Sequence, residues 1–201
     1  MNVRKATIVD TERIAKIHVR SWQAAYKDSL PAAFLESLDV GERQAMWRSC
    51  IENGGKLFVA EDDDPKVIGF LNIAKARDRN LEEATELTAI YLDPKYYGSG
   101  IGTRFWKKIE KDITTNSVYL WVLSTNPIGI AFYEKNGFLP DGEKKSFQID
   151  GQEFEELRYS KFLNHQAWAL RKCPINGRRG RDGPVFAQGF AGAQLPGRPK
   201  R

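Results

Sequence analysis

The sequence predicts a single domain of the mixed α/β class, with antiparallel hairpins at both ends of a central sheet. The periodic segments follow the order strand, two or three helices, three strands, helix, strand, helix and two strands. This order differs from the regular alternation of strand and helix in a doubly wound fold. Turn-forming residues separate paired strands at 62–65 and at Asp150-Gly151. A length of 201 residues suits one sizeable core and is short for two domains.

The first quarter of the chain is predicted to be mainly helical. Residues 3–8 have the pattern of a short strand, and Asp10 follows as the cap of a helix of about 16 residues. That helix has one buried stripe, formed by Ile14, Ile17, His18, Trp22, Ala25 and Tyr26. A later helix starts with a capping box of Asp39 and Glu42 and ends at residues 53–55. Its periodic apolar face consists of Ala45, Met46, Cys50 and Ile51.

Strands dominate the rest of the body. The expected strands are residues 57–60, 67–73, 86–92, 118–123, 138 onward and 155–160. A glycine-rich turn leads into a helix over about residues 102–112. Another helix has Asn126 as its cap, Pro127 at its first position and Gly137 just past its end, which is the usual asymmetry of helix ends.

The net charge of +5 is unevenly distributed along the chain. Residues 161–201 hold nine basic residues and one acidic residue, whereas residues 1–160 hold 22 basic and 25 acidic residues and carry −3. The basic segment is rich in Gly, Pro and Arg, so we expect a mostly disordered tail after a folded domain of residues 1–160. Nucleic acid is an unlikely partner of the acidic body, and only the tail would neutralise phosphates. A merely solvated extension is the alternative.

Several classes of protein are disfavoured by composition. No apolar run approaches the roughly 18 residues that span a bilayer, so we expect no membrane partner. The first residues contain no hydrophobic signal segment, so we expect a cytoplasmic protein. Cys50 and Cys173 form no metal-ligand pattern, and we expect no metal. Apolar residues after the body, at Phe162, Leu163, Trp168 and Leu170, leave a homodimer contact open.

The strongest local signal is the sequence Tyr-Gly-Ser-Gly-Ile-Gly-Thr at residues 97–103, which follows a strand and opens a helix. Glycines let backbone N–H groups approach an anion, and the helix N-terminus adds a partial positive charge. The segment lacks the Gly-Lys-Ser/Thr of a P-loop and the spacing of the dinucleotide fingerprint. It predicts a pyrophosphate site, with a purely connecting turn as the alternative.

A second signal lies in residues 122–138, where a strand, a helix cap, a helix and a Gly-Phe pair follow one another. Asn126 and Tyr133 are seven residues apart, so about two helical turns place them near one line. Asn126 can present its amide to a ligand, and Tyr133 can present a phenolic proton. The alternatives are that Asn126 only caps the helix and that Tyr133 only fills the core.

Together the two stretches resemble the GNAT superfamily of N-acyltransferases, in particular its bacterial N-acetyltransferases. The resemblance covers roughly residues 1–160, because residues 18–26, Pro31, Arg43 and Trp47 look like the first helices of bacterial members. It implies a mostly antiparallel sheet of about 6–7 strands with splayed central strands, flanked by about 4–5 helices. Tyr97 stands where the family has Arg or Gln, so we expect weaker or differently tuned CoA binding.

The resemblance also implies a donor and its contacts. Acetyl-CoA would place its pyrophosphate on the backbone of Gly98, Ser99, Gly100, Ile101, Gly102 and Thr103. Its pantetheine arm would pair with the backbone at Ile90 and Leu92, and Asn126 would bond in the gap between the splayed strands. Tyr133 would give a proton to the departing thiolate. The alternatives are a non-catalytic acyl-CoA-binding module and association with nucleic acid or the ribosome through the tail.

The implied reaction is direct attack of an acceptor's primary amine on the thioester, which requires the amine to lose a proton. We expect Glu86 to act as the base, because period two places it on the same face as Thr88 and Ile90. Glu82, Glu83 and a bound water remain open, as does an exposed, idle Glu86. The acceptor is expected to be a small molecule or a peptide, and the sequence does not identify it.

Overall fold

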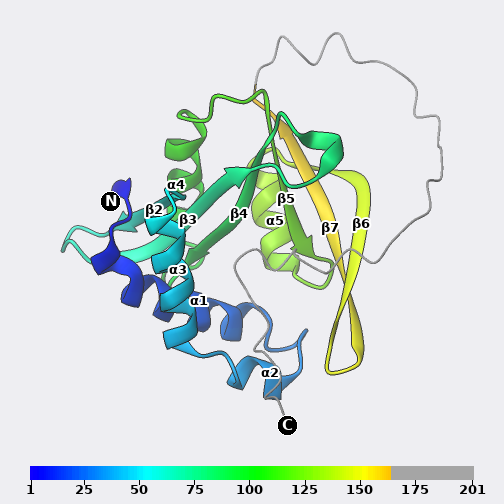
Figure 1. The fold of residues 1–201 in the computed structure, drawn as a ribbon, viewed down its shortest axis with the longest axis horizontal. Helices are drawn as coiled ribbons and strands as arrows, with labels where there is room; N and C mark the ends of the chain where they lie inside the picture. Colours follow the sequence, from blue (N-terminus) through cyan, green and yellow to red (C-terminus); the bar gives the residue numbers. More distant parts are fainter. Residues whose placement is uncertain (164–201) are drawn as a thin grey trace.

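A computed structural model describes residues 1–163, which form a seven-stranded sheet in the order β1-β2-β3-β4-β5-β7-β6 (Figure 1). Every neighbouring pair is antiparallel except β4 and β5. The strands are β1 (Asn2–Lys5), β2 (Lys56–Glu61), β3 (Val67–Lys75), β4 (Thr85–Leu92), β5 (Ser117–Leu123), β6 (Leu139–Ile149) and β7 (Gln152–Phe162). The predicted mixed fold is confirmed. The expected disorder of the tail falls on residues outside the described range.

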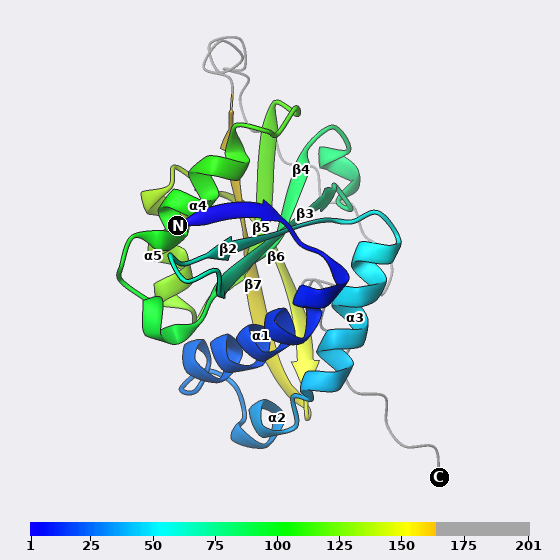
Figure 2. The ribbon, with the colours of Figure 1, turned by 90° about the vertical axis from the view of Figure 1, so that its left-hand side faces the viewer.

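Within residues 1–163, five α-helices cover the two faces of the sheet (Figure 2). They are α1 (Thr11–Ala25), α2 (Ala32–Glu36), α3 (Val40–Glu52), α4 (Ile101–Glu110) and α5 (Pro127–Lys135). Helices α1 to α3 pack on one face, where Ile14, Trp47 and Phe70 share a core cluster. Helices α4 and α5 cover the other face, where Phe105 and Phe138 are fully buried.

Local signals place several element ends as predicted. Asp39 Oδ1 accepts the backbone N–H of Glu42 at 2.8 Å and caps α3. Asn126 Oδ1 accepts the N–H of Gly129 at 2.9 Å and caps α5. The turn between β6 and β7 has positive φ at both central residues, 49° at Asp150 and 82° at Gly151, as a two-residue hairpin of this hand requires.

Two predictions near the start of the chain are wrong, and one for α3 is wrong in part. The first strand stops at Lys5, and a 3-10 turn over Ile8–Asp10 comes before α1. The carboxylate of Asp10 does not cap α1, because it accepts from Arg4 and from the backbone N–H of Thr7 instead. On α3 the predicted residues Met46, Cys50 and Ile51 pack partly buried against the core, whereas Ala45 is exposed, and the fully buried side chains are Arg43 and Trp47.

The last strand is longer than the pattern indicated. Strand β7 runs two residues past Ser160 and ends at Phe162, so the first residues of the segment expected as tail are paired in the sheet. Val118 and Ser117 of β5 are their partners.

The centre of the sheet is splayed, because β4 and β5 share only two residue pairs, Thr85 with Val118 and Glu86 with Tyr119. Beyond these pairs the two strands separate, as Figure 1 shows. Strands β1 to β4 and strands β5 to β7 therefore meet at one end only. The predicted splay of the central strands is confirmed.

A β-bulge in β4 changes which residues share a face. Leu87 lies opposite Ile73 and Ala89 lies opposite Asn72, so Thr88 is an extra residue. The side chain of Asn72 holds it, since Asn72 Oδ1 accepts the hydroxyl of Thr88 at 2.5 Å. Side chains after the bulge consequently point to the face opposite to that expected from simple alternation.

No helix in the described range is long and apolar enough to cross a membrane.

Candidate active site

A cleft of about 370 Å³ opens where β4 and β5 separate. Its walls come from the end of α1, from β4, from the glycine-rich turn, from β5 and from the first two turns of α5. The side chains and backbone that line it include Trp22, Tyr26, Ile90, Tyr91, Leu92, Tyr97, Gly98, Gly100, Gly102, Thr103, Trp121, Leu123, Asn126, Phe132, Tyr133 and Glu156. The splay therefore brings the two predicted motifs to one cavity.

The glycine-rich turn forms an open cradle at one end of this cleft. Gly98 and Gly100 have φ near +75°, a conformation that side chains with a Cβ disfavour, and no atom lies within 4 Å of a Cβ built at either position. Within the described part of the chain, the N–H groups of Gly100, Gly102 and Thr103 have no hydrogen-bonded acceptor. Since α4 starts at Ile101, these donors sit at the positive end of a helix.

Ile90 and Leu92 of β4, whose backbone is predicted to pair with the donor, both line the cleft. Ile90 and Leu92 point to the α4 side of the sheet and pack against the cluster around Phe105. Tyr97 also lines the cleft and is 39% exposed. Burial raises the pKa of the Tyr97 phenol, so this side chain offers a neutral hydroxyl where an arginine would offer charge.

Asn126 caps α5, and its amide contacts a residue of the cleft wall. Its Oδ1 caps α5, and its Nδ2 donates to the hydroxyl of Tyr26 at 3.4 Å. The side chain is buried and lies on the cleft wall. The helix cap thus positions a donor inside the cavity, next to a residue from the end of α1.

Three phenols meet in the middle of the cleft. Tyr133 on α5, Tyr26 after α1 and Tyr91 on β4 all line it. Burial raises the pKa of Tyr26 to about 12 and raises the pKa values of Tyr133 and Tyr91 well above the ordinary value. Tyr91 is fixed in place, since its hydroxyl accepts the indole N–H of Trp22 at 2.9 Å. All three phenols therefore stay protonated at neutral pH.

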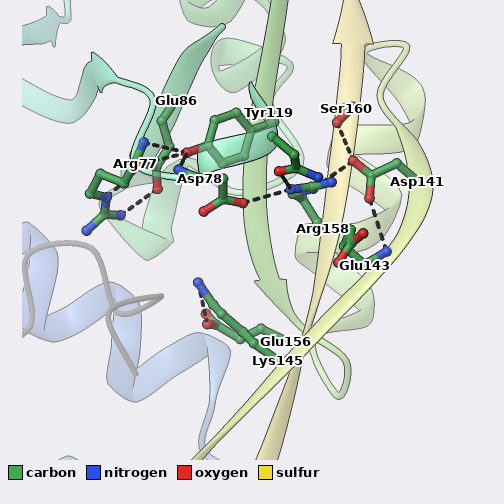
Figure 3. Close-up of polar contacts among 11 residues, drawn as sticks. Arg77, Asp78, Glu86, Tyr119, Asp141, Glu143, Lys145, Glu156, Arg158 and Ser160 are labelled. Carbon is green, nitrogen blue, oxygen red and sulfur yellow. Dashed lines mark hydrogen bonds and ion pairs between the residues drawn. The ribbon is translucent and has the colours of Figure 1, made fainter. Parts of the chain in front are cut away.

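Glu86 does not lie where the sequence predicted. Because of the extra residue Thr88, Glu86 and Ile90 point to opposite faces of the sheet. Its side chain is 2% exposed, so the alternative of an exposed, idle carboxylate is also wrong. Arg77 Nε donates to it at 2.8 Å and the Tyr119 hydroxyl donates at 3.0 Å, as Figure 3 shows. Both oxygens are thus engaged, and Glu86 is not among the residues of the cleft wall.

The other two candidate bases are exposed and also lie outside the cleft. Glu82 and Glu83 precede β4, on the connection from β3.

The carboxylate that does reach the cleft is Glu156 on β7, which sequence reasoning missed. It is 5% exposed and pairs across the hairpin with Lys145, whose Nζ lies 3.5 Å from Glu156 Oε2. Burial raises the pKa of Glu156 and lowers that of Lys145. A signal was present in the sequence, since alternation along β7 places position 156 on the same face as Phe154, which is buried.

The described residues contain no group of three or more His, Cys, Asp or Glu side chains placed to hold a metal ion. His18, the one histidine of the body, is fully buried in the core of α1 and α3, and its Nδ1 accepts from the indole N–H of Trp47 at 3.1 Å. Burial lowers its pKa to about 3, so this imidazole is neutral and structural.

The chain is similar in sequence to known proteins. A family model described as the acetyltransferase (GNAT) family matches residues 11–138. The uncharacterized N-acetyltransferase YuaI of Bacillus subtilis is 31% identical over 161 residues, which cover 78% of this chain and 90% of that protein. The spermidine N(1)-acetyltransferase of Thermoplasma acidophilum is 25% identical, with 77% and 94% covered.

Among solved structures, the PaiA N-acetyltransferase of Thermoplasma acidophilum in complex with coenzyme A has the same fold, with a TM-score of 0.59 and 24% identity. The match covers 80% of this chain and 98% of that one.

Proposed function

The chain belongs to the acetyltransferase (GNAT) family, and from that premise we propose that it transfers an acetyl group from acetyl-CoA to the primary amine of a small-molecule or peptide acceptor. The observation that carries the proposal is the position of the cleft. It passes through the splayed sheet, with the glycine cradle at one end and a buried carboxylate at the other. Such a passage lets a donor and an acceptor approach one point from opposite faces.

The cradle fits the pyrophosphate of a CoA thioester. An anion there would receive the free N–H groups of Gly100, Gly102 and Thr103, and the open space at Gly98 and Gly100 would admit its oxygens. The gap between β4 and β5 leaves the backbone of Ile90 and Leu92 without a partner strand on that side. We propose that this backbone and Asn126 hold the pantetheine arm, and that Ser99 and Ile101 complete the cradle.

Acetyl-CoA supplies the activated acyl group as a thioester. The chain's own residues orient it, exclude water and move protons. Tyr133 is proposed as the acid that protonates the sulfur, because it lines the cleft and its raised pKa keeps the proton in place until thiolate forms. Holding both reactants in one narrow passage adds the proximity contribution.

The acceptor is proposed as an amine because the family transfers acetyl groups to nitrogen and because related proteins carry such names. One relative is named as a spermidine acetyltransferase, and the identity of 25% leaves the acceptor of this chain to experiment. The acceptor would enter from the α1 and α2 side, where Trp22 and Tyr26 border the cleft.

Thermal unfolding of the full chain with and without acetyl-CoA tests the proposal. Ligand at about 100 times its dissociation constant stabilises a protein by about 2.7 kcal/mol. For a protein of this size we expect the melting temperature to rise by roughly 5–10 °C. A folded protein that shows no rise with acetyl-CoA or with longer acyl-CoAs would contradict the donor site. A rise in melting temperature without release of the free CoA thiol in the presence of any amine would instead indicate a non-catalytic acyl-CoA-binding module.

A further inference from the structure

The sheet face toward α1 carries a network of charged side chains beside the cleft, drawn in Figure 3. Glu86 binds Arg77 through both oxygens. Arg158 binds two carboxylates, Asp78 at 2.9 Å and Asp141 at 2.8 Å. The pair of Lys145 and Glu156 lies at the end of the network that borders the cleft. These ion pairs join three cations and four carboxylates, so the network has one negative charge in excess.

Glu156 is the member of this network with incomplete partners. Within the described chain, its Oε2 is buried and accepts no hydrogen bond of good geometry, and Lys145 approaches no closer than 3.5 Å. A buried carboxylate ordinarily accepts several hydrogen bonds. Lys145 is itself drawn to a second partner, because its Nζ lies 3.9 Å from the centre of the Trp121 ring. The cleft wall therefore includes a buried carboxylate, one oxygen of which has no hydrogen-bond donor in the described residues.

Glu156 is also the only Asp or Glu among the residues that line the cleft in the described structure. Strand register places Glu156 opposite Leu123, and Leu123 precedes Asn126 by three residues. Its charge acts on Tyr26, whose hydroxyl receives the N–H of Asn126. The carboxylate thus lies on the acceptor side of the same cavity that holds the proposed proton donor Tyr133.

We propose that Glu156 receives the acceptor's ammonium group and removes its proton, and that Lys145 holds this carboxylate until the acceptor replaces it. The inference rests on the proposed acetyl transfer and identifies the acceptor class as a cationic primary amine. Glu156 takes over the base role predicted for Glu86, whose oxygens are occupied by Arg77 and Tyr119.

The proton balance of the step is complete without another reactant. An ammonium N–H bond breaks and its proton passes to Glu156, which later returns it to water. The freed nitrogen pair forms the bond to the carbonyl carbon, and the bond from that carbon to sulfur breaks. The second proton of the nitrogen replaces the one that Tyr133 gives to the sulfur. The products are an N-acetylated amine, free CoA and one proton.

The pH dependence of the reaction reports on Glu156, because only its ionised form accepts a proton. Four charged or titratable groups act on it: Lys145 on β6, Arg77 on the connection after β3, Glu86 on β4 and Tyr26 after α1. Burial raises the pKa of Glu156, and the cation of Lys145 opposes the rise. We therefore expect kcat/KM to rise with pH through a value above that of an ordinary carboxyl group, about 4.3.

The test uses the full chain, acetyl-CoA and three probe amines: spermidine, a peptide with N-terminal alanine, and benzylamine. For each amine that the native chain acetylates, Glu156→Gln is expected to lower kcat/KM by about 100-fold or more and to abolish the acidic limb of the pH profile. Calorimetry should show an acetyl-CoA affinity within about twofold of the native value. If acetyl-CoA itself does not bind, the proposed function fails rather than this assignment.

The matched control is Glu155→Gln, on the adjacent residue of the opposite face, where Glu155 pairs with Lys144 at 3.2 Å. Glu155→Gln should leave both kcat/KM and its pH profile unchanged. Glu86→Gln should keep the acidic limb, whatever it does to stability. An acidic limb that survives in Glu156→Gln and disappears in Glu86→Gln would overturn the assignment.

A second variant covers the case in which Glu156→Gln does not fold. Lys145→Met removes the cation beside Glu156, so the acidic limb should move to higher pH and KM for the amine should fall. An unmoved limb would overturn the proposal. Binding of acetyl-CoA with no acetylation of any of the three amines would also overturn it, because a site for cationic amines would then be absent.

Discussion

The two ends of the cleft are built in different ways. The proposed donor end consists of backbone N–H groups from one continuous stretch, residues 97–103, whose glycines leave them uncovered. The proposed acceptor end consists of side chains from distant parts of the chain, among them Trp22, Tyr26 and Glu156. The first end depends on local backbone geometry, and the second depends on how the sheet brings charges together.

This difference teaches what each end tolerates. A backbone cradle is indifferent to most side-chain changes and sensitive to any change in φ or free space. A charged side-chain site is sensitive to single atoms, because a buried carboxylate without its partner is costly. The donor end is therefore suited to an unvarying ligand, and the acceptor end can acquire a new specificity through one substitution.

The largest expected effect follows from closing the cradle. Gly100→Glu places a side chain and a negative charge where the donor's phosphates would lie, so we expect acetyl-CoA affinity to fall by about 100-fold or more. The control is Gly54→Glu, because Gly54 has the same φ of +76° and equally open space but lies at the end of α3. Both variants carry the same backbone strain, of about 1–2 kcal/mol. Calorimetry that shows equal affinities in the two variants would refute the backbone cradle.

The next largest effect separates acetyl-CoA binding from the chemical step. Tyr133→Phe removes the proposed acid and leaves the ring, so we expect turnover to fall by about 10–100-fold with acetyl-CoA affinity within about twofold. Tyr159→Phe is the control, because Tyr159 is buried beside Glu134 and outside the cleft. If Tyr26→Phe is slow and Tyr133→Phe is not, the acid is Tyr26.

A smaller effect separates the two contacts of Asn126. Asn126→Ala removes the cap of α5, and we expect the free energy of unfolding to fall by about 1 kcal/mol. Asn126→Asp keeps an oxygen for the N–H of Gly129 and loses the donor to Tyr26. Thermal unfolding should therefore show that the Asp variant melts above the Ala variant. Equal melting temperatures would mean that the cap contributes little to stability.

The smallest effect is expected at Ser99, inside the cradle. Its hydroxyl is already engaged, because it donates to the backbone carbonyl of Tyr96 at 2.6 Å and accepts from the N–H of Ile101 at 3.4 Å. Ser99→Ala should change acetyl-CoA affinity by less than about twofold, as measured by calorimetry. A loss of tenfold would show that the donor end relies on side chains after all.

Local patterns sufficed to predict the glycine-rich turn and most helices and strands. Three features depend on residues that are close together in the chain and can therefore be predicted from the sequence. They are the glycine-rich turn, the cap at Asn126 and the hairpin turn at Asp150. Glu86 was misplaced for a non-local reason. The bulge at Thr88 is held by Asn72 on the neighbouring strand, and simple alternation has no means of showing it.

The position of Glu156 could be predicted in part from the sequence. Counting outward from the turn at Asp150-Gly151 pairs Lys145 with Glu156, on the face that also carries Phe147 and Phe154. An acidic and a basic residue opposite each other on an apolar face are an unusual pattern, and it indicates an ion pair between them. What the count does not show is that β4 separates from β5 beside this pair and opens the cleft onto it.

The short ladder between β4 and β5 also bears on self-association. An unpaired strand edge is a template for strands of other chains, and the split gives this sheet two inner edges besides the outer ones. The outer strand β1 has only four residues, and β6 contains Pro140 and an irregular stretch before Lys144. The inner edges face each other across a gap that is joined at one end, so a strand of another chain would have to enter that gap to pair with either of them. The cleft thus keeps exposed main chain for a ligand while shielding it from aggregation.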